Sequence, residues 1–273
     1  MSRRTTAVAV LVLLLGLCVG CSSGSSSSSD SSPTPEAASS PAASPGPAPV
    51  VGDCHQLTYT GAGQPTDDTA PVPCAGAHTS QTIKVGSIDA LTGGADDVDA
   101  DEVRGDVARA CPPRLLRRVG GDEVKRRLSR FEVVWFTPTE KAMDAGAGWF
   151  RCDVVGLAAD DSLLRLPRTV VRALDDPAAL DRYGTCGTKA PGKPGFTRVV
   201  CKRKHAWRAV DTVDLDRSAR YLGARAAAQG DSDCKDVAAA RANGALKYTW
   251  SFEWPTRDLW TSGQRYGYCW VPG

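Results

Sequence analysis

The stretches that decide the fold are FEVVWFTPTEKAMDAGAGWFRC (residues 131–152) and YTWSFEWPTRDLWTSGQRYGYC (residues 248–269). They align without a gap, and each has Pro-Thr, then a glycine, then a cysteine at the same spacing. In the second stretch, aromatic residues alternate with other residues on both sides of the glycine, which is typical of β-strands with one aromatic face. The glycine marks a turn. Both stretches therefore predict a pair of strands.

The order of the upstream residues repeats as well. Cys74-x-x-x-His78 precedes the first stretch, and Cys201-x-x-x-His205 precedes the second. In each half, one further cysteine comes before this motif and another comes between it and the strands. We therefore expect two diverged copies of one module, over 51–173 and 174–273. The break between them is expected near Asp175-Asp176-Pro177.

Hydrophobic periodicity predicts the other elements. Apolar residues at helical spacing predict helices over 99–111 and 122–130 in the first half, and over 218–228 and 233–242 in the second. Alternating or short apolar runs predict strands over 81–88, 131–136, 149–157, 197–201, 207–215, 248–254 and 266–270. Each module is thus expected to be α+β, a small antiparallel sheet with one or two helices.

The N-terminus has the pattern of an export signal. Two arginines precede an apolar run over residues 7–19, which is shorter than the roughly 20 residues of a spanning helix. Residues 17–21, LCVGC, resemble a bacterial lipobox, with Cys18 where leucine is commonest. The resemblance implies a signal peptide over 1–20 and lipid, such as palmitate, on Cys21. A conventionally cleaved signal and a membrane-spanning anchor are the alternatives.

Such a lipid would anchor the exported chain to the outer face of the cytoplasmic membrane. Residues 21–50 are rich in Ser, Pro, Ala and Gly, so a disordered linker is expected to carry the folded part. The chain has 33 basic and 31 acidic residues, and Arg3 and Arg4 leave with the signal. This balance argues against nucleic-acid binding. Basic runs at 114–130 and 202–204 are expected to be solvated, with anionic lipid or wall polymer as the alternative contact.

Ten cysteines are present, and all but Cys18 and Cys21 fall in the two modules. An even number in an exported chain predicts a disulfide framework. If each module closes its own bridges, three pairings per module remain. We favour first with second and third with fourth, because the first cysteine starts a strand and the second ends a short apolar run. The expected bridges are Cys54–Cys74, Cys111–Cys152, Cys186–Cys201 and Cys234–Cys269.

His78 and His205 are candidate binding residues because they recur at the same distance from a cysteine. Such a pair can ligate zinc, but a structural zinc site needs about four ligands, and these cysteines are expected to be oxidised. We therefore expect no metal and no cofactor. Trp260, in the loop expected before Gly263, is a candidate exposed aromatic residue. The sequence contains no nucleophile elbow, zinc-protease motif or phosphate-binding loop, so no catalytic residue is assigned.

Taken with these motifs, each half resembles the septum-formation domain of actinobacterial membrane-anchored and exported proteins. The resemblance rests on Val51-Gly52-Asp53-Cys54, Val72-Pro73-Cys74 with His78, Cys111, and Pro138…Gly146…Cys152. The second half keeps His205 and its cysteines but starts with Gly184-Thr185-Cys186. The resemblance implies a role in cell division or the envelope and brings no catalytic residues.

The sequence therefore favours a non-enzymatic, lipid-anchored binding or scaffold protein of the cell envelope, linked to septum formation. Its partners are expected to be the membrane, through Cys21, and an envelope protein or wall polymer. One alternative is a cell-wall enzyme that uses His78 or His205 as acid or base. Another is a spacer without a binding partner.

Overall fold

The computed structural model describes residues 44–94, 100–216, 220, 221 and 223–273. The expected signal peptide, Cys21 and most of the expected linker lie outside the described residues. The described residues belong to one compact unit. Within the described part of the chain, no helix is long and apolar enough to cross a membrane.

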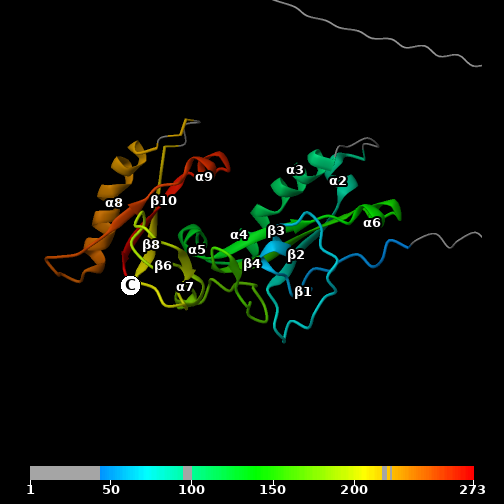
Figure 1. Cartoon of the computed structure of the whole chain (residues 1–273), viewed down its shortest axis with the longest axis horizontal. Coiled ribbons are helices and arrows are strands. Elements are labelled where there is room, and N and C mark those ends of the chain that lie inside the picture. The colour runs from blue at the N-terminus through cyan, green and yellow to red at the C-terminus, as the bar shows by residue number, and fades with distance from the viewer. Residues whose placement is uncertain (1–43, 95–99, 217–219, 222) are drawn as a thin grey trace, which may run out of the picture. The chain divides into compact units, whose positions relative to one another are not determined.

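The first half contains an antiparallel sheet in the order β1-β2-β4-β3 (Figure 1). Its strands are β1 (Cys54–His55), β2 (Ser80–Ser87), β3 (Phe131–Phe136) and β4 (Trp149–Ala159). Its helices are α1 (Tyr59–Ala62), α2 (Ile88–Thr92), α3 (Ala100–Ala110), α4 (Pro112–Val119), α5 (Glu123–Leu128) and α6 (Glu140–Asp144).

The second half has the equivalent order, β6-β8-β10-β9. Its strands are β6 (Thr185–Gly187), β7 (Arg198–Val200), β8 (Trp207–Asp214), β9 (Ser251–Glu253) and β10 (Tyr266–Pro272). Its helices are α7 (Ala179–Tyr183), α8 (Arg225–Arg241) and α9 (Arg257–Thr261). The end of β4 also pairs with β5 (Ser162–Leu163) and with β7, which makes the sheet continuous.

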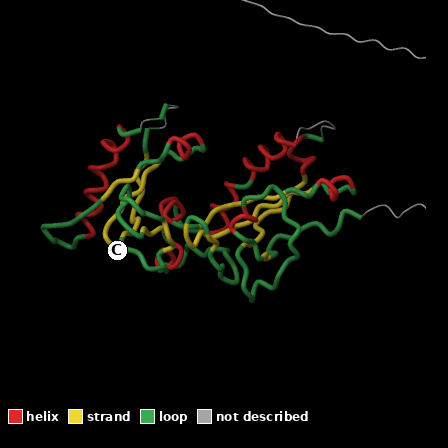
Figure 2. Tube along the Cα trace, in the orientation of Figure 1, coloured by secondary structure: helices red, strands yellow, loops and turns green. Residues whose placement is uncertain are grey.

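Alternation along the strands places one face of each half against helices (Figure 2). In the first half, Val107 of α3 and Val119 of α4 pack against Phe150 and Val154 of β4. In the second half, residues of α8 and α9 pack with Phe252 and Val210. The expected α+β class, with mixed helices and antiparallel strands, is confirmed.

The expected disulfide framework is also confirmed. The four bridges join Cys54 to Cys74, Cys111 to Cys152, Cys186 to Cys201, and Cys234 to Cys269. These are the pairs favoured from the sequence. Two bridges join a helical region to a long strand of the same half, β4 or β10, and the other two close the start of each half. Native bridges of this kind typically contribute about 2–5 kcal/mol each.

Packing crosses the expected module boundary in both directions. Leu174 and Ala179, which follow that boundary, are fully buried in the first core. In return, Leu128 of α5 is 2% exposed and packs with Ala209 of β8 and Trp270 of β10. Each half therefore completes its core with a segment from the other.

Helix α8 differs from the sequence expectation. The helices expected over 218–228 and 233–242 form a single helix from Arg225 to Arg241, although part of the first lies outside the described residues. Gly230 lies in the gap between the two expected helices, and glycine is unfavourable inside helices. Tertiary packing explains why a glycine is present: the Phe252 ring lies so close that a Cβ at Gly230 would be 2.2–2.5 Å from its ring atoms.

The Gly230→Ala variant is expected to lower the free energy of unfolding by about 1–3 kcal/mol, because the added methyl group overpacks the Phe252 ring. Urea unfolding followed by tryptophan fluorescence measures this. The control is Gly105→Ala in α3, where the nearest atom to an added Cβ belongs to the flexible Arg109 side chain at 3.3 Å. That variant should gain up to roughly 1 kcal/mol from helix propensity. Equal effects of both variants would contradict the packing argument.

Candidate functional site

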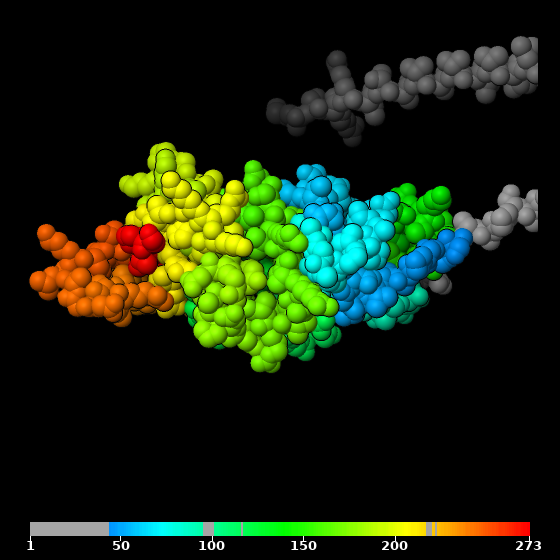
Figure 3. Space-filling view, turned by 90° about the horizontal axis from the view of Figure 1, so that it is seen from below, coloured from blue at the N-terminus to red at the C-terminus, as the bar shows by residue number. Residues whose placement is uncertain are grey.

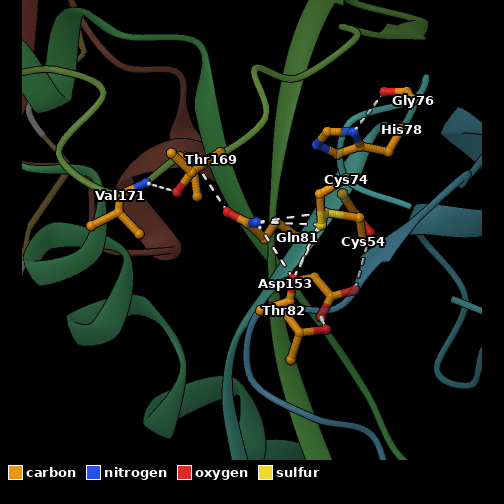
Figure 4. Close-up of a disulfide and its surroundings, with 12 residues drawn as sticks. Cys54, Cys74, Gly76, His78, Gln81, Thr82, Asp153, Thr169 and Val171 are labelled. Atoms are coloured by element: carbon orange, nitrogen blue, oxygen red, sulfur yellow. Dashed lines mark hydrogen bonds between the residues drawn. A yellow bond between two sulfur atoms is a disulfide. The ribbon is translucent and has the colours of Figure 1, made fainter. Parts of the chain in front are cut away.

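The two repeated histidines occupy similar local turns. His78 is fully buried, and its Nδ1 lies 3.2 Å from the carbonyl oxygen of Gly76 (Figure 4). His205 is partly buried, and its Nδ1 lies 2.7 Å from the carbonyl oxygen of Arg203. In both turns, the imidazole bonds the backbone two residues before it. This geometry supports a local structural role for both rings.

Trp260 is buried, and the expectation that it is exposed is wrong. Its exposed fraction is 3%, and it packs in the core of the second half. The segment before Gly263 is helix α9, not a loop, because the Thr256 hydroxyl caps it by accepting a hydrogen bond from Leu259 N at 3.3 Å. The helix turns Trp260 inward, where its ring meets Tyr221 edge-on at 6.0 Å. It is therefore unsuited to bind a partner at the surface.

A cavity of about 620 Å³ lies where the two halves meet, and we call it the junction cavity. Its walls come from α4, α5 and β3 of the first half, and from β8, β10 and the loop before β10 in the second half. The lining residues are Pro112, Leu115, Val119, Glu123, Arg126, Arg127, Ser129, Phe131, Glu132, Asp214, Gly263, Arg265, Tyr266 and Tyr268. Its size and mixed lining are typical of a binding site.

Arg127 organises one wall of the junction cavity. Its guanidinium donates hydrogen bonds to Asp214 Oδ1 at 2.8 Å and to Glu123 Oε1 at 2.6 Å. It also lies over the Tyr266 ring, 4.3 Å from the centroid. The Tyr268 hydroxyl donates to the Arg127 carbonyl oxygen at 3.2 Å. These bonds fix aromatic and charged groups from both halves in one wall.

The two tyrosines offer neutral hydroxyl groups. Burial raises the pKa of Tyr266, and it raises the pKa of Tyr268 well above its usual value. Arg126 and Arg265 add charge at the same wall, where they donate to the carbonyl oxygens of Gly121 and Trp260. An aromatic wall with neutral hydroxyls and guanidinium groups suits recognition of a polar chain or a sugar ring.

No sequence motif indicates this cavity, because its residues are scattered over 112–132, 214 and 263–268. The family model described as septum formation matches residues 51–269. The chain belongs to the septum-formation family. No curated protein and no solved structure matched it.

The match covers both halves as one region, so all the residues that line the junction cavity lie inside the family region.

The family region also contains a polar cluster in the first half, on the sheet face opposite α3 and α4. The cluster consists of His55, Asp67, Ser80, Thr82, Arg151 and Asp153, all with buried side chains.

Arg151 and Asp153 form the centre of the polar cluster. Arg151 Nε lies 3.3 Å from Asp153 Oδ2, and the same guanidinium donates to Asp67 through Nη2. Asp153 also accepts hydrogen bonds from Thr82 Oγ1 at 2.8 Å and Ser80 Oγ at 3.2 Å (Figure 4). One guanidinium thus serves two buried carboxylates.

The polar cluster was not predicted from the sequence, although the sequence contains one signal of it. Arg151 and Asp153 alternate with apolar residues in a strand that is otherwise apolar, so both must point to one face. At the same alignment offset, the second half has Tyr268 and Trp270. His55, directly after Cys54, has no repeated counterpart.

Among the residues that the structure describes, no group of three or more His, Cys, Asp or Glu side chains is placed to hold a metal ion.

The pH dependence of stability is expected to report on Asp153. Burial raises the pKa of this carboxyl above its usual value, against the opposing effects of Arg151, Thr82 and the nearby His55. An acid with a raised folded-state pKa favours folding below its unfolded pKa and loses that contribution as pH rises through the folded pKa. Wild type should therefore lose stability relative to Asp153→Asn as pH rises from about 3.9, the usual value for Asp.

Urea unfolding of wild type and Asp153→Asn between roughly pH 3 and 8 measures the difference, because that range spans the usual pKa and a raised one. A gain in wild-type stability relative to the variant with rising pH would show that the carboxylate, not the protonated acid, is the favoured form.

Proposed function

We propose that this septum-formation protein is a lipid-anchored binding protein outside the cytoplasmic membrane, which holds an envelope protein or wall polymer during septum formation. The observation that carries the proposal is the junction cavity, because both halves contribute its walls. A spacer has no need of such a cavity. The four disulfides support a location outside the cytoplasm, where such bridges persist.

We further propose that the halves are diverged copies of one module. Two observations support this: the strand order β1-β2-β4-β3 recurs as β6-β8-β10-β9, and each half closes the same two bridges. The lipid on Cys21 is a proposal from the sequence pattern. Metabolic labelling with an alkyne fatty acid should mark wild type, and Cys21→Ser should lose the label and leave the membrane fraction.

Site-specific photocrosslinking in dividing cells tests the binding role. A benzophenone side chain at Glu123, which is 66% exposed at the cavity, should crosslink to a partner. The control position is Leu246, which is 99% exposed and does not line the cavity. We expect a discrete product from position 123 only. No product at 123, or the same products from both positions, would contradict the proposed site.

The enzymatic alternative makes a different prediction. An envelope hydrolase that depends on His78 or His205 would lose turnover of wall polymer in the folded His→Ala variants. A binding protein should show no turnover in wild type and retain its crosslink in a His205→Ala variant. Wild-type hydrolysis that His205→Ala or His78→Ala abolishes would establish the enzyme instead.

A further inference from the structure

A second cavity, of about 530 Å³, lies in the first half near the polar cluster, and we call it the His55 cavity. Its walls are the proline-rich stretch 45–50, the loop 67–71, and parts of α6 and β4. Figure 3 shows the first two, blue and cyan, side by side on the surface. The polar, charged and aromatic side chains of the lining are Asp53, His55, Asp67, Asp68, Thr69, Thr139, Trp149 and Arg151.

His55 has one ring nitrogen without a partner. The residue is 1% exposed, and its Nδ1 lies 3.2 Å from the carbonyl oxygen of Thr69. A carbonyl oxygen can only accept, so Nδ1 carries a hydrogen, and in the neutral ring Nε2 then has a lone pair. Nε2 is buried and has no hydrogen-bond partner. A buried polar atom of this kind is costly unless a donor reaches it.

The charges around His55 define which donor fits. The lining contains three carboxylates, from Asp53, Asp67 and Asp68, and a single cationic side chain, Arg151. Arg151 already donates a hydrogen bond to Asp67 and forms an ion pair with Asp153. The cavity therefore has excess negative charge, which excludes an anion and favours a cationic donor.

The rest of the lining is apolar. Pro45, Pro47, Pro49 and Pro71 contribute hydrocarbon surface, together with Ala142 and the Trp149 ring. An aliphatic chain gains free energy by burial against such a surface. An ammonium group near an indole ring gains further electrostatic attraction. The lining thus combines a site for a hydrocarbon chain with a site for its charged end.

We infer that the His55 cavity binds a primary ammonium group on an aliphatic chain, with His55 Nε2 and the carboxylate of Asp68 as its acceptors. Nε2 lies below the solvent-exposed surface, so the ammonium group displaces part of the lining as it enters. The exposed residues 45–48 form no helix or strand, and this wall yields at the least cost. The inference concerns a different cavity from the one in the proposed function, and either can fail without the other.

Imidazole nitrogen spectra of the full-length protein test the inference directly. The chain has three histidines, so labelling histidine with ¹⁵N gives three ring systems to follow. Nα-acetyl-lysine N-methylamide is the probe, and its Nε-acetylated form is the matched uncharged control. The amine should shift the His55 Nε2 resonance and leave His78 and His205 unchanged, whereas the acetylated control should shift none.

A pair of exposed variants tests the role of charge without threatening the fold. Asp68→Asn should weaken binding of the amine by about threefold to fivefold, the effect of one partly exposed charge pair. Asp161→Asn, on an exposed turn outside the cavity, should leave the affinity unchanged. Tetramethylammonium separates charge attraction from hydrogen bonding, because it keeps the positive charge but cannot donate a hydrogen bond to Nε2. It should therefore bind more weakly than the lysine amine.

Three results would overturn the inference: no shift of His55 with the amine, an equal shift with the acetylated control, or equal affinity in Asp68→Asn and wild type. Each result can be measured on the folded protein, and none depends on the outcome of the crosslinking at the junction cavity.

Discussion

The Arg151→Ala variant is expected to lose about 3–5 kcal/mol of the free energy of unfolding, the usual cost of removing one partner from a buried ion pair. Arg151 is 3% exposed and is the guanidinium between Asp67 and Asp153. Its removal leaves two buried carboxylates without their counter-charge. The Phe136 ring, 4.7 Å from the guanidinium, loses a packing partner as well. Urea unfolding at neutral pH measures the loss.

The matched control is Arg109→Ala on α3. Arg109 also pairs with an aspartate, Asp106, but its side chain is 73% exposed. An exposed pair of this kind is worth only about 0–1 kcal/mol. Similar losses in both variants would show that burial does not strengthen the Arg151 interactions.

A triple variant separates the cost of an unpaired charge from the worth of the charge cluster. Arg151→Met with Asp67→Leu and Asp153→Leu removes all three buried charges, and such apolar replacements are often close to neutral. It should therefore be more stable than Arg151→Ala alone. The second half shows this apolar solution, with Tyr268 and Trp270 at the aligned positions.

The Leu128→Ala variant is expected to lower the free energy of unfolding by about 2–5 kcal/mol, the range for buried leucines. Leu128 lies in the first half of the chain, but its contacts, Ala209 and Trp270, belong to the second. The loss of packing should therefore destabilise strands of the second half, far from residue 128 in the sequence. Hydrogen exchange should become faster in β8 and β10, and urea unfolding gives the overall loss.

The control for Leu128 lies on the same helix. Val124 in α5 is 36% exposed, and Val124→Ala should cost much less because less apolar surface is lost. Faster hydrogen exchange confined to the first half in Leu128→Ala would contradict the packing of α5 in the core of the second half. This packing also predicts that residues 174–273 cannot form a stable core alone, because the contacts of α5 would be missing.

Much of the fold could be predicted from the sequence. Strand alternation located β3, β4, β8 and β10 to within a few residues, because side chains on a sheet have a period of two. Cysteine order indicated the bridges, because the same order occurs twice and export favours oxidation. The candidate site was harder to predict from the sequence. The motif histidines His78 and His205 stabilise local turns, whereas the two cavities combine residues that no spacing connects.

The sequence by itself determined the strands, the α+β class, the cysteine order and the family, because these depend on local periodicity and motif spacing. Only the tertiary structure decided that Trp260 is buried, that Gly230 lies inside one helix, and that α5 completes the core of the other half. These features depend on which surfaces meet. The polar cluster around Arg151 belongs with them, because a buried charge has meaning only through the partners that the fold brings to it.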